Sequence, residues 1–165
     1  MLRNLWMTQY FTPIPIRMLL TKTYLLPTLI YGCELFASCD AVCRRRLNVT
    51  FNNIARYVFG IKRNSSISHY AKQIYNITFD NLMKCRVLLL LHRIVYNRQL
   101  LYLYQKIKFS RSSRGKKINF IKYSKAASEQ LFFINSIRLW SPLPSQLQLI
   151  SNASQFKTAI FKHFS

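Results

Sequence analysis

The stretch that decides the fold is TFDNLMKCRVLLLLHRIVYN, residues 78–97. Thr78 is a suitable N-cap, and Asp80 in the first turn suits the positive end of a helix dipole. The stretch is apolar almost all round. Its exception is one narrow stripe at helical spacing: Arg86, Arg93 and Asn97. A helix of this kind lies at the centre of a core, so the stretch predicts a mainly α fold built around it.

A second helix is predicted from about 41 to Phe59, with Asp40 as its N-cap and Gly60 at its end. Apolar residues recur along it at helical spacing and predict its buried face: Leu47, Phe51, Ile54, Ala55, Val58 and Phe59. Polar residues at the same period predict the opposite face: Arg45, Asn52 and Arg56. The helix is therefore expected to be amphipathic, with a basic outer side.

The remaining segments predict shorter elements. Residues 16–36 favour a helix that Pro27 kinks or interrupts. A polar loop covers Lys62 to Ser68, and a short helix covers Ser68 to Tyr75. Two short extended segments, a possible hairpin, are expected around 118–123 and 130–135. A last helix runs from about Ala153 to His163, with Asn152 as its N-cap.

The charge is the strongest indication of function. The chain has 25 Lys+Arg and only 4 Asp+Glu, a formal net charge of +21, although 50% of its residues are hydrophobic. A disordered basic tail would lack so many apolar residues, so we expect a folded body coated with cations. Nucleic acid is the usual polyanion for such a surface. A flexible linker over 109–117 adds four candidate phosphate ligands: Arg111, Arg114, Lys116 and Lys117.

Independent chemistry is not expected. The acids are scattered at Glu34, Asp40, Asp80 and Glu129, whereas phosphoryl transfer with two metal ions needs clustered carboxylates. The histidines are isolated, the cysteine spacing fits no usual zinc pattern, and no phosphate-binding glycine motif is present. His92 and Cys85 are interpreted as core side chains. We therefore expect no catalytic residue, metal or cofactor and, without a window of about 20 apolar residues, no membrane partner.

Several blocks resemble non-LTR (LINE-type, jockey-like) retrotransposon reverse transcriptases. LLPTLIYGCE at 25–34 is similar to a block that follows the palm domain of that family, and RYVFGI at 56–61 to one of its helix ends. The segments 66–75 and 86–96 follow in the family's order. The ending is the most specific part: LWSPLP at 139–144, then SQFKTAIFK at 154–162. Phe36 and Ser141 stand where the family usually has Trp and Asn.

This resemblance implies the thumb and post-thumb region of an RNA-directed DNA polymerase from a transposable element. The family's endonuclease, fingers and palm would lie upstream of Met1, so we expect a fragment that is no enzyme on its own. The thumb-like helical region would cover 1–108, and 118–165 would pack back on it. Expected partners are RNA or an RNA–DNA hybrid and the missing palm and fingers. The location would be intracellular, and nuclear if the parent element's activity applies.

Two readings compete with nucleic-acid binding. The chain can instead be a basic structural or interaction module whose cations meet a protein partner or an acidic membrane surface, or a remnant of a mobile element with no present role. The residues expected to contact phosphate under the first reading are Arg45, Asn52, Arg56, Arg86, Arg93, Arg111, Arg114, Lys116 and Lys117.

Overall fold

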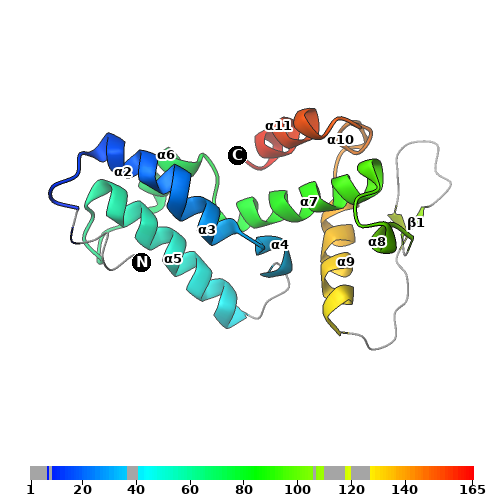
Figure 1. The fold of residues 1–165 in the computed structure, drawn as a ribbon, viewed down its shortest axis with the longest axis horizontal. Coiled ribbons are helices and arrows are strands. Elements are labelled where there is room, and N and C mark those ends of the chain that lie inside the picture. The colour runs from blue at the N-terminus through cyan, green and yellow to red at the C-terminus, as the bar shows by residue number, and fades with distance from the viewer. Residues whose placement is uncertain (1–6, 8, 37–40, 106, 110–117, 120–126) are drawn as a thin grey trace. The chain divides into compact units, whose positions relative to one another are not determined.

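The computed structural model describes residues 7, 9–36, 41–105, 107–109, 118–119 and 127–165. Helices dominate these residues, which confirms the expected mainly α fold (Figure 1). The contacts divide the chain into two compact units. Unit 1 is Met1–Cys33 with Cys39–Asp80, and unit 2 is Glu34–Ser38 with Asn81–Ser165. Each unit is described by itself.

In unit 1, the chain up to Cys33 forms α2 (Ile14–Leu20), the π-helix η1 (Thr21–Leu25) and α3 (Leu26–Ile30). The short helix α4 (Cys33–Phe36) follows, and from Glu34 onward it belongs to unit 2. The chain stays helical through Pro27, so the proline does not interrupt the helix, which was one of the two expectations. It changes from π to α between Leu25 and Leu26, and Pro27 falls in the first turn of α3, where proline is tolerated. The break comes at Tyr31, and Gly32 then has a φ of +65°.

The largest helix of unit 1 is α5 (Ala41–Phe59), which has the predicted limits. Its C-terminal half buries Phe51, Ile54, Ala55, Tyr57 and Val58. Gly60 has a φ of +68°, the left-handed conformation that commonly ends a helix. The expected N-cap, Asp40, lies outside the described residues. After a loop, α6 (Ser68–Tyr75) forms with the predicted limits, and it packs against α5.

The buried side chain of Arg17 closes the C-terminal end of α5. Its Nη1 donates a hydrogen bond of 2.9 Å to the carbonyl of Tyr57, in the last turn of the helix. A guanidinium at this position satisfies a carbonyl that the helix leaves open and suits the negative end of the dipole. The contact joins α2 to the C-terminal end of α5, the helix that carries the predicted basic residues.

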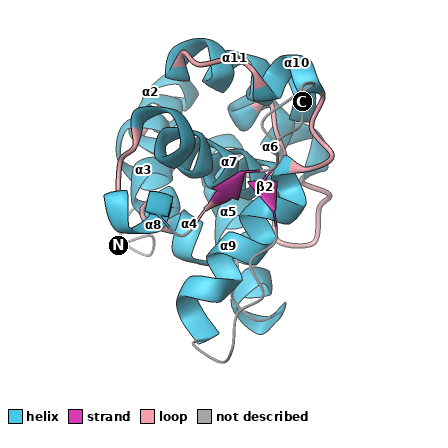
Figure 2. Cartoon of the chain, turned by 90° about the vertical axis from the view of Figure 1, so that its right-hand side faces the viewer, coloured by secondary structure: helices cyan, strands magenta, loops and turns pink. Residues whose placement is uncertain are grey.

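The central helix α7 (Phe79–Asn97) also has the predicted limits, and from Asn81 onward it belongs to unit 2. The unit continues with α8 (Leu101–Gln105), β1 (Lys108–Phe109), β2 (Ile118–Asn119), α9 (Ala127–Trp140), α10 (Ser145–Gln148) and α11 (Ala153–Phe164). The two short strands, seen in Figure 2, are antiparallel, with Lys108 opposite Asn119 and Phe109 opposite Ile118.

The predicted extended segment at 130–135 is wrong, because these residues belong to α9. The short run of aromatic and branched residues there suits a strand locally. Over a longer window, the buried side chains have the spacing of one helix face: Phe132, Ser136, Ile137 and Trp140. The strand that pairs with β2 comes instead from before the linker. Residues 110–117 lie outside the described residues, so the division of the chain at 109–117 stays a prediction.

The C-terminal segment of unit 2 is fastened to α7 around His92. The imidazole is fully buried between two rings, with centroids 4.2 Å from Phe156 and 4.7 Å from Tyr96. Its Nε2 donates to the carbonyl of Ile150 at 2.7 Å. Trp140 is also fully buried, 5.8 Å from Phe156 between ring centroids. The interpretation of His92 as a core histidine is confirmed.

Two further side chains complete this fastening. The Tyr96 hydroxyl donates to the carbonyl of Gln148. The Gln148 amide in turn donates to the carbonyls of Trp140 and Leu143, both at 3.0 Å. Three side chains thus satisfy four backbone carbonyls of this segment, those of Trp140, Leu143, Gln148 and Ile150, as polar groups inside a core require.

Candidate nucleic-acid interface

The N-terminal half of α5 is an exposed basic part of unit 1. Its first two turns contain Ala41, Val42, Arg44, Arg45 and Arg46, and all five side chains are exposed. The reason lies in the sequence, because the buried apolar face of α5 begins only at Phe51. This half of the helix therefore presents three consecutive guanidinium groups to solvent.

The predicted residues of α5 share one side of the helix. Arg45, Asn52 and Arg56 stand seven and four positions apart, which places them within one stripe along the axis. Arg45 is exposed, whereas Asn52 and Arg56 are half-buried. Arg45 and Arg56 are separated by eleven positions, or about 16 Å along the axis at the usual helical rise. The stripe is long enough to face several phosphates of one backbone.

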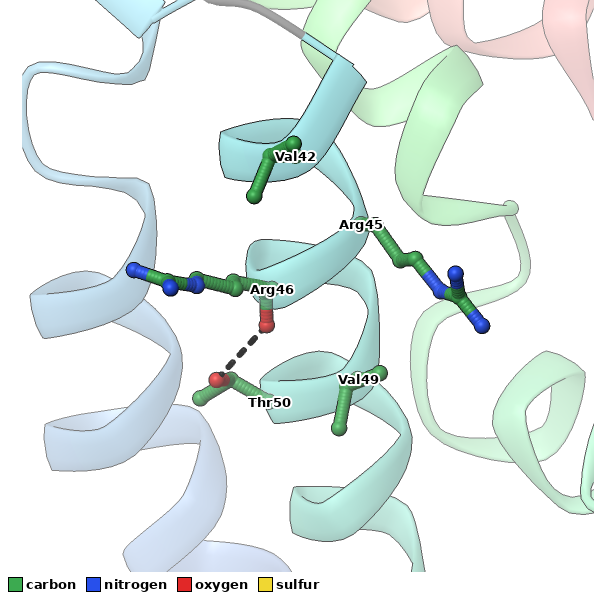
Figure 3. A pocket seen from close by; sticks show the side chains of 5 residues that line it. All are labelled: Val42, Arg45, Arg46, Val49 and Thr50. Carbon is green, nitrogen blue, oxygen red and sulfur yellow. Dashed lines mark hydrogen bonds between the residues drawn. The ribbon is translucent and has the colours of Figure 1, made fainter.

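A shallow hollow of about 410 Å³ lies beside this stripe. Figure 3 shows its five lining residues on α5, with Val42 and Val49 along the helix and Arg45 and Arg46 extending to opposite sides. The two valines are 58% and 50% exposed. Thr50 also lines the hollow, and its hydroxyl donates to the carbonyl of Arg46 at 3.0 Å. The hollow therefore combines an apolar strip with a permanent cation on each side.

This combination suits a ligand that alternates charged and apolar parts. None of the five lining side chains is acidic. A guanidinium binds phosphate oxygens through paired N–H groups and stays charged at any accessible pH. A sugar–phosphate backbone presents phosphates with the C–H edges of sugars between them. The five lining side chains thus offer cations and apolar surface, and none of them is a usual general base.

Arg56 is held differently from Arg45. Its Nη1 donates to Asn53 Oδ1 and its Nη2 to the carbonyl of Arg63, both at 3.3 Å. Its Nε is buried and has no hydrogen-bond partner among the described residues. Both acceptors are neutral, so the positive charge of Arg56 is not compensated by them. Arg56 thus contributes charge to the stripe while tying the loop after α5 to the helix.

The second predicted stripe lies on α7, in unit 2. Arg93 and Asn97 are exposed, and Arg86 is half-buried with a buried Nε that has no partner among the described residues. The structure thus brings the predicted residues together in two sets, one on α5 and one on α7. The four linker residues Arg111, Arg114, Lys116 and Lys117 lie outside the described residues, so their role stays a prediction.

Cys85, next to Arg86, is a core side chain. It is fully buried, as interpreted from the sequence, and its Sγ lies 3.9 Å from the carbonyl of Ile160. Burial raises the pKa of this thiol from 9.0 to about 12, while the nearby charges of Arg86 and Lys84 lower it by less. The protonated, enclosed thiol is no nucleophile at neutral pH.

Sequence reasoning missed the hollow and its second cation. The run Arg44-Arg45-Arg46 is visible in the sequence, yet helical periodicity selected Arg45 alone. Periodicity also assigned no role to Val42 and Val49, which follow the same stripe. Apolar residues seven positions apart on the basic side were the signal that could have indicated this surface.

The described part of the chain holds no group of three His, Cys, Asp or Glu side chains able to bind a metal ion. None of its described helices has the length and hydropathy needed to cross a bilayer. Comparisons with models of protein families, with curated proteins and with solved structures found no match to this chain.

Proposed function

We propose that this chain binds RNA or an RNA–DNA duplex through the sugar–phosphate backbone, as the thumb and post-thumb region of a non-LTR retrotransposon reverse transcriptase. The observation that carries the proposal is the exposed end of α5, where Arg45 and Arg46 flank Val42 and Val49. The net charge of +21 and the ordered sequence blocks support it. In this role Arg45 and Arg46 neutralise phosphates, and the valines contact sugar edges between them.

The binding mode follows from these groups. Lys and Arg on phosphates position a protein on its ligand but do not read bases, so binding is sequence-tolerant. Each neutralised phosphate releases counterions, so affinity falls steeply as salt rises. With six to ten phosphate contacts the loss is on the order of a thousandfold or more between 50 and 200 mM salt. In this proposal other parts of the parent polymerase catalyse polymerisation, and this chain holds the nucleic acid by its backbone.

The test is a filter-binding titration of the full chain against a short RNA–DNA hybrid at several salt concentrations. We expect the wild-type affinity to fall linearly with salt on a logarithmic plot. The double variant Arg45→Gln/Arg46→Gln should reduce that slope by about 0.7 to 0.9 for each lost contact. The matched control Lys157→Gln/Lys162→Gln removes two exposed cations from α11 and should leave the slope nearly unchanged.

Two results would overturn the proposal. One is absent or salt-independent binding by the wild-type chain. The other is an equal reduction of the slope in both double variants, because the charge of the whole chain would then suffice and the α5 surface would have no special role.

A basic interaction module is a second candidate, and exposed apolar side chains favour it. Phe11, Leu19, Tyr24 and Tyr31 are 89%, 61%, 61% and 86% exposed. Large exposed apolar side chains are candidates for contacts with a protein or a membrane when they form a contiguous patch. Flotation with liposomes of anionic lipid, run beside the hybrid titration, separates the two candidates. Flotation without hybrid binding would favour the interaction module.

A further inference from the structure

The loop between α5 and α6 carries a run of exposed polar residues that the proposed backbone contacts do not use. Five consecutive side chains, from Lys62 to Ser66, are exposed. The sequence of the run is KRNSS, followed by the half-buried Ile67. The run is not helical, and a single turn hydrogen bond of 3.2 Å joins Ser65 N to the carbonyl of Lys62. It is therefore a short, accessible segment in which two serine hydroxyl groups follow two cations in the sequence.

This arrangement has the chemistry of a kinase substrate. Protein kinases select substrates partly by complementary charge, and those with acidic substrate grooves favour Arg or Lys a few positions before the serine. Arg63 stands three positions before Ser66. Lys62 stands at the same spacing before Ser65, so the identity of the cation separates the two serines. We propose that Ser66 is a phosphorylation site for a protein kinase that selects arginine over lysine three positions before its serine.

The structure separates Ser66 from another serine with the same spacing. Ser141 also follows an arginine, Arg138, by three positions. The Ser141 hydroxyl donates to the carbonyl of Ile137 at 2.9 Å, and the preceding Trp140 is fully buried. An extended substrate conformation at Ser141 would pull Trp140 out of the core. At Ser66 an extended conformation would open the turn between Lys62 and Ser65 and the contact of Arg56 with Arg63, but each of the four preceding side chains is exposed, so none of them leaves the core.

The reaction is an ordinary phosphoryl transfer from ATP. Ser66 Oγ attacks the γ-phosphorus, a new O–P bond forms, and the bond from that phosphorus to ADP breaks. The hydroxyl proton passes to the catalytic carboxylate of the kinase. The product carries about −1.5 to −2 charges at Ser66 at neutral pH.

The modification would act on the α5 surface through charge, a consequence that rests on the proposed function. Arg56 Nη2 donates to the carbonyl of Arg63 at 3.3 Å, so this loop is tied to the helix that carries the basic stripe. A phosphate there offsets the charges of Lys62, Arg63 and Arg56. We expect phosphorylation to lower the affinity for the hybrid about fivefold or more at physiological salt.

The experiment uses the full chain, ATP and the catalytic subunit of the cyclic-AMP-dependent protein kinase as a probe. Trypsin cleaves after Arg63 and Lys72, and the peptide 64–72 is sequenced by tandem mass spectrometry. We expect phosphate on Ser66 and none in this peptide from Ser66→Ala. In Arg63→Gln the cleavage site at residue 63 is lost, and the corresponding peptide 63–72 should be phosphorylated at an initial rate at least tenfold lower. Lys162→Gln, which removes a cation from α11, should leave the rate unchanged.

An unmodified peptide, phosphate on Ser65 in place of Ser66, or equal modification of Ser141 would overturn the assignment. The phosphorylated and unmodified chains are then titrated with the hybrid. If the unmodified chain does not bind, the proposed function fails, while the mass spectrum still decides the modification. If both forms bind equally, the site stands and its regulatory effect is refuted.

Discussion

The exposed N-terminal half of α5 in unit 1 and the core around His92 in unit 2 use their polar side chains in opposite ways. On α5 of unit 1, Arg45 and Arg46 extend into solvent on either side of two exposed valines (Figure 3). In unit 2, His92, Tyr96 and Gln148 turn their polar atoms inward onto backbone carbonyls. Surface charge adds little to stability, whereas buried hydrogen bonds and aromatic packing add much. Binding and stability should therefore be separable by mutation.

The largest expected effect is on the stability of unit 2. Trp140 is fully buried beside Phe156, so Trp140→Ala should lower the free energy of unfolding by about 3–5 kcal/mol. Urea unfolding followed by far-UV circular dichroism measures this loss. Leu149→Ala, at a residue 60% exposed, is the control and should change the free energy by about 0.5 kcal/mol or less. A loss below about 1 kcal/mol for Trp140→Ala would contradict a core anchored there.

A smaller effect should appear at high pH, also in unit 2. The folded pKa of Cys85 is about 12 against 9.0 for an unburied thiol, so above pH 9 the unfolded chain loses a proton that the folded chain keeps. Stability then falls as pH rises, by about 1.4 kcal/mol between pH 8 and 10. Burial also raises the pKa of Tyr96, which acts with the same sign at still higher pH.

Urea unfolding at the two pH values tests this expectation. Cys85→Ala should lack the part of the fall that Cys85 causes, whereas Cys43→Ala in unit 1 should keep it. Equal falls in the two variants would show that the Cys85 thiol is not the group that titrates. The comparison of slopes is independent of any cavity that the alanine leaves, because a cavity lowers stability at both pH values alike.

The same contrast explains which elements were predictable. The limits of α5 and α7 follow from apolar periodicity and from a glycine or an N-cap at the ends, which are local signals. Residues 130–135 were assigned wrongly because their local pattern fits a strand, while the burial of Phe132 and Trp140 on one helix face depends on distant partners. Tertiary packing decided the outcome there.

The candidate site was predictable to a similar degree. Spacing alone placed Arg45, Asn52 and Arg56 on one side of a helix, and the structure agrees. Spacing could not indicate that Arg56 reaches the carbonyl of Arg63, because that bond depends on the path of the loop. Nor could it indicate that Val42 and Val49 stay exposed, because exposure depends on what the neighbouring elements leave uncovered.

The smallest expected effect is a loss of stability at the N-cap of α11, near the end of the chain. Asn152 Oδ1 accepts hydrogen bonds from Ser154 N at 2.9 Å and Gln155 N at 3.2 Å, which makes it the N-cap predicted for α11. Asn152→Ala leaves these two donors without their partner and should destabilise unit 2 by about 1 kcal/mol. Asn152→Asp keeps the acceptor and adds a favourable charge at the helix start, so its stability should be restored or slightly raised. Urea unfolding of both variants measures this difference, since equal losses of stability would mean that the acceptor at position 152 contributes nothing.

Neither change alters the cations of α5, so the salt dependence of hybrid binding should stay at its wild-type value in both variants.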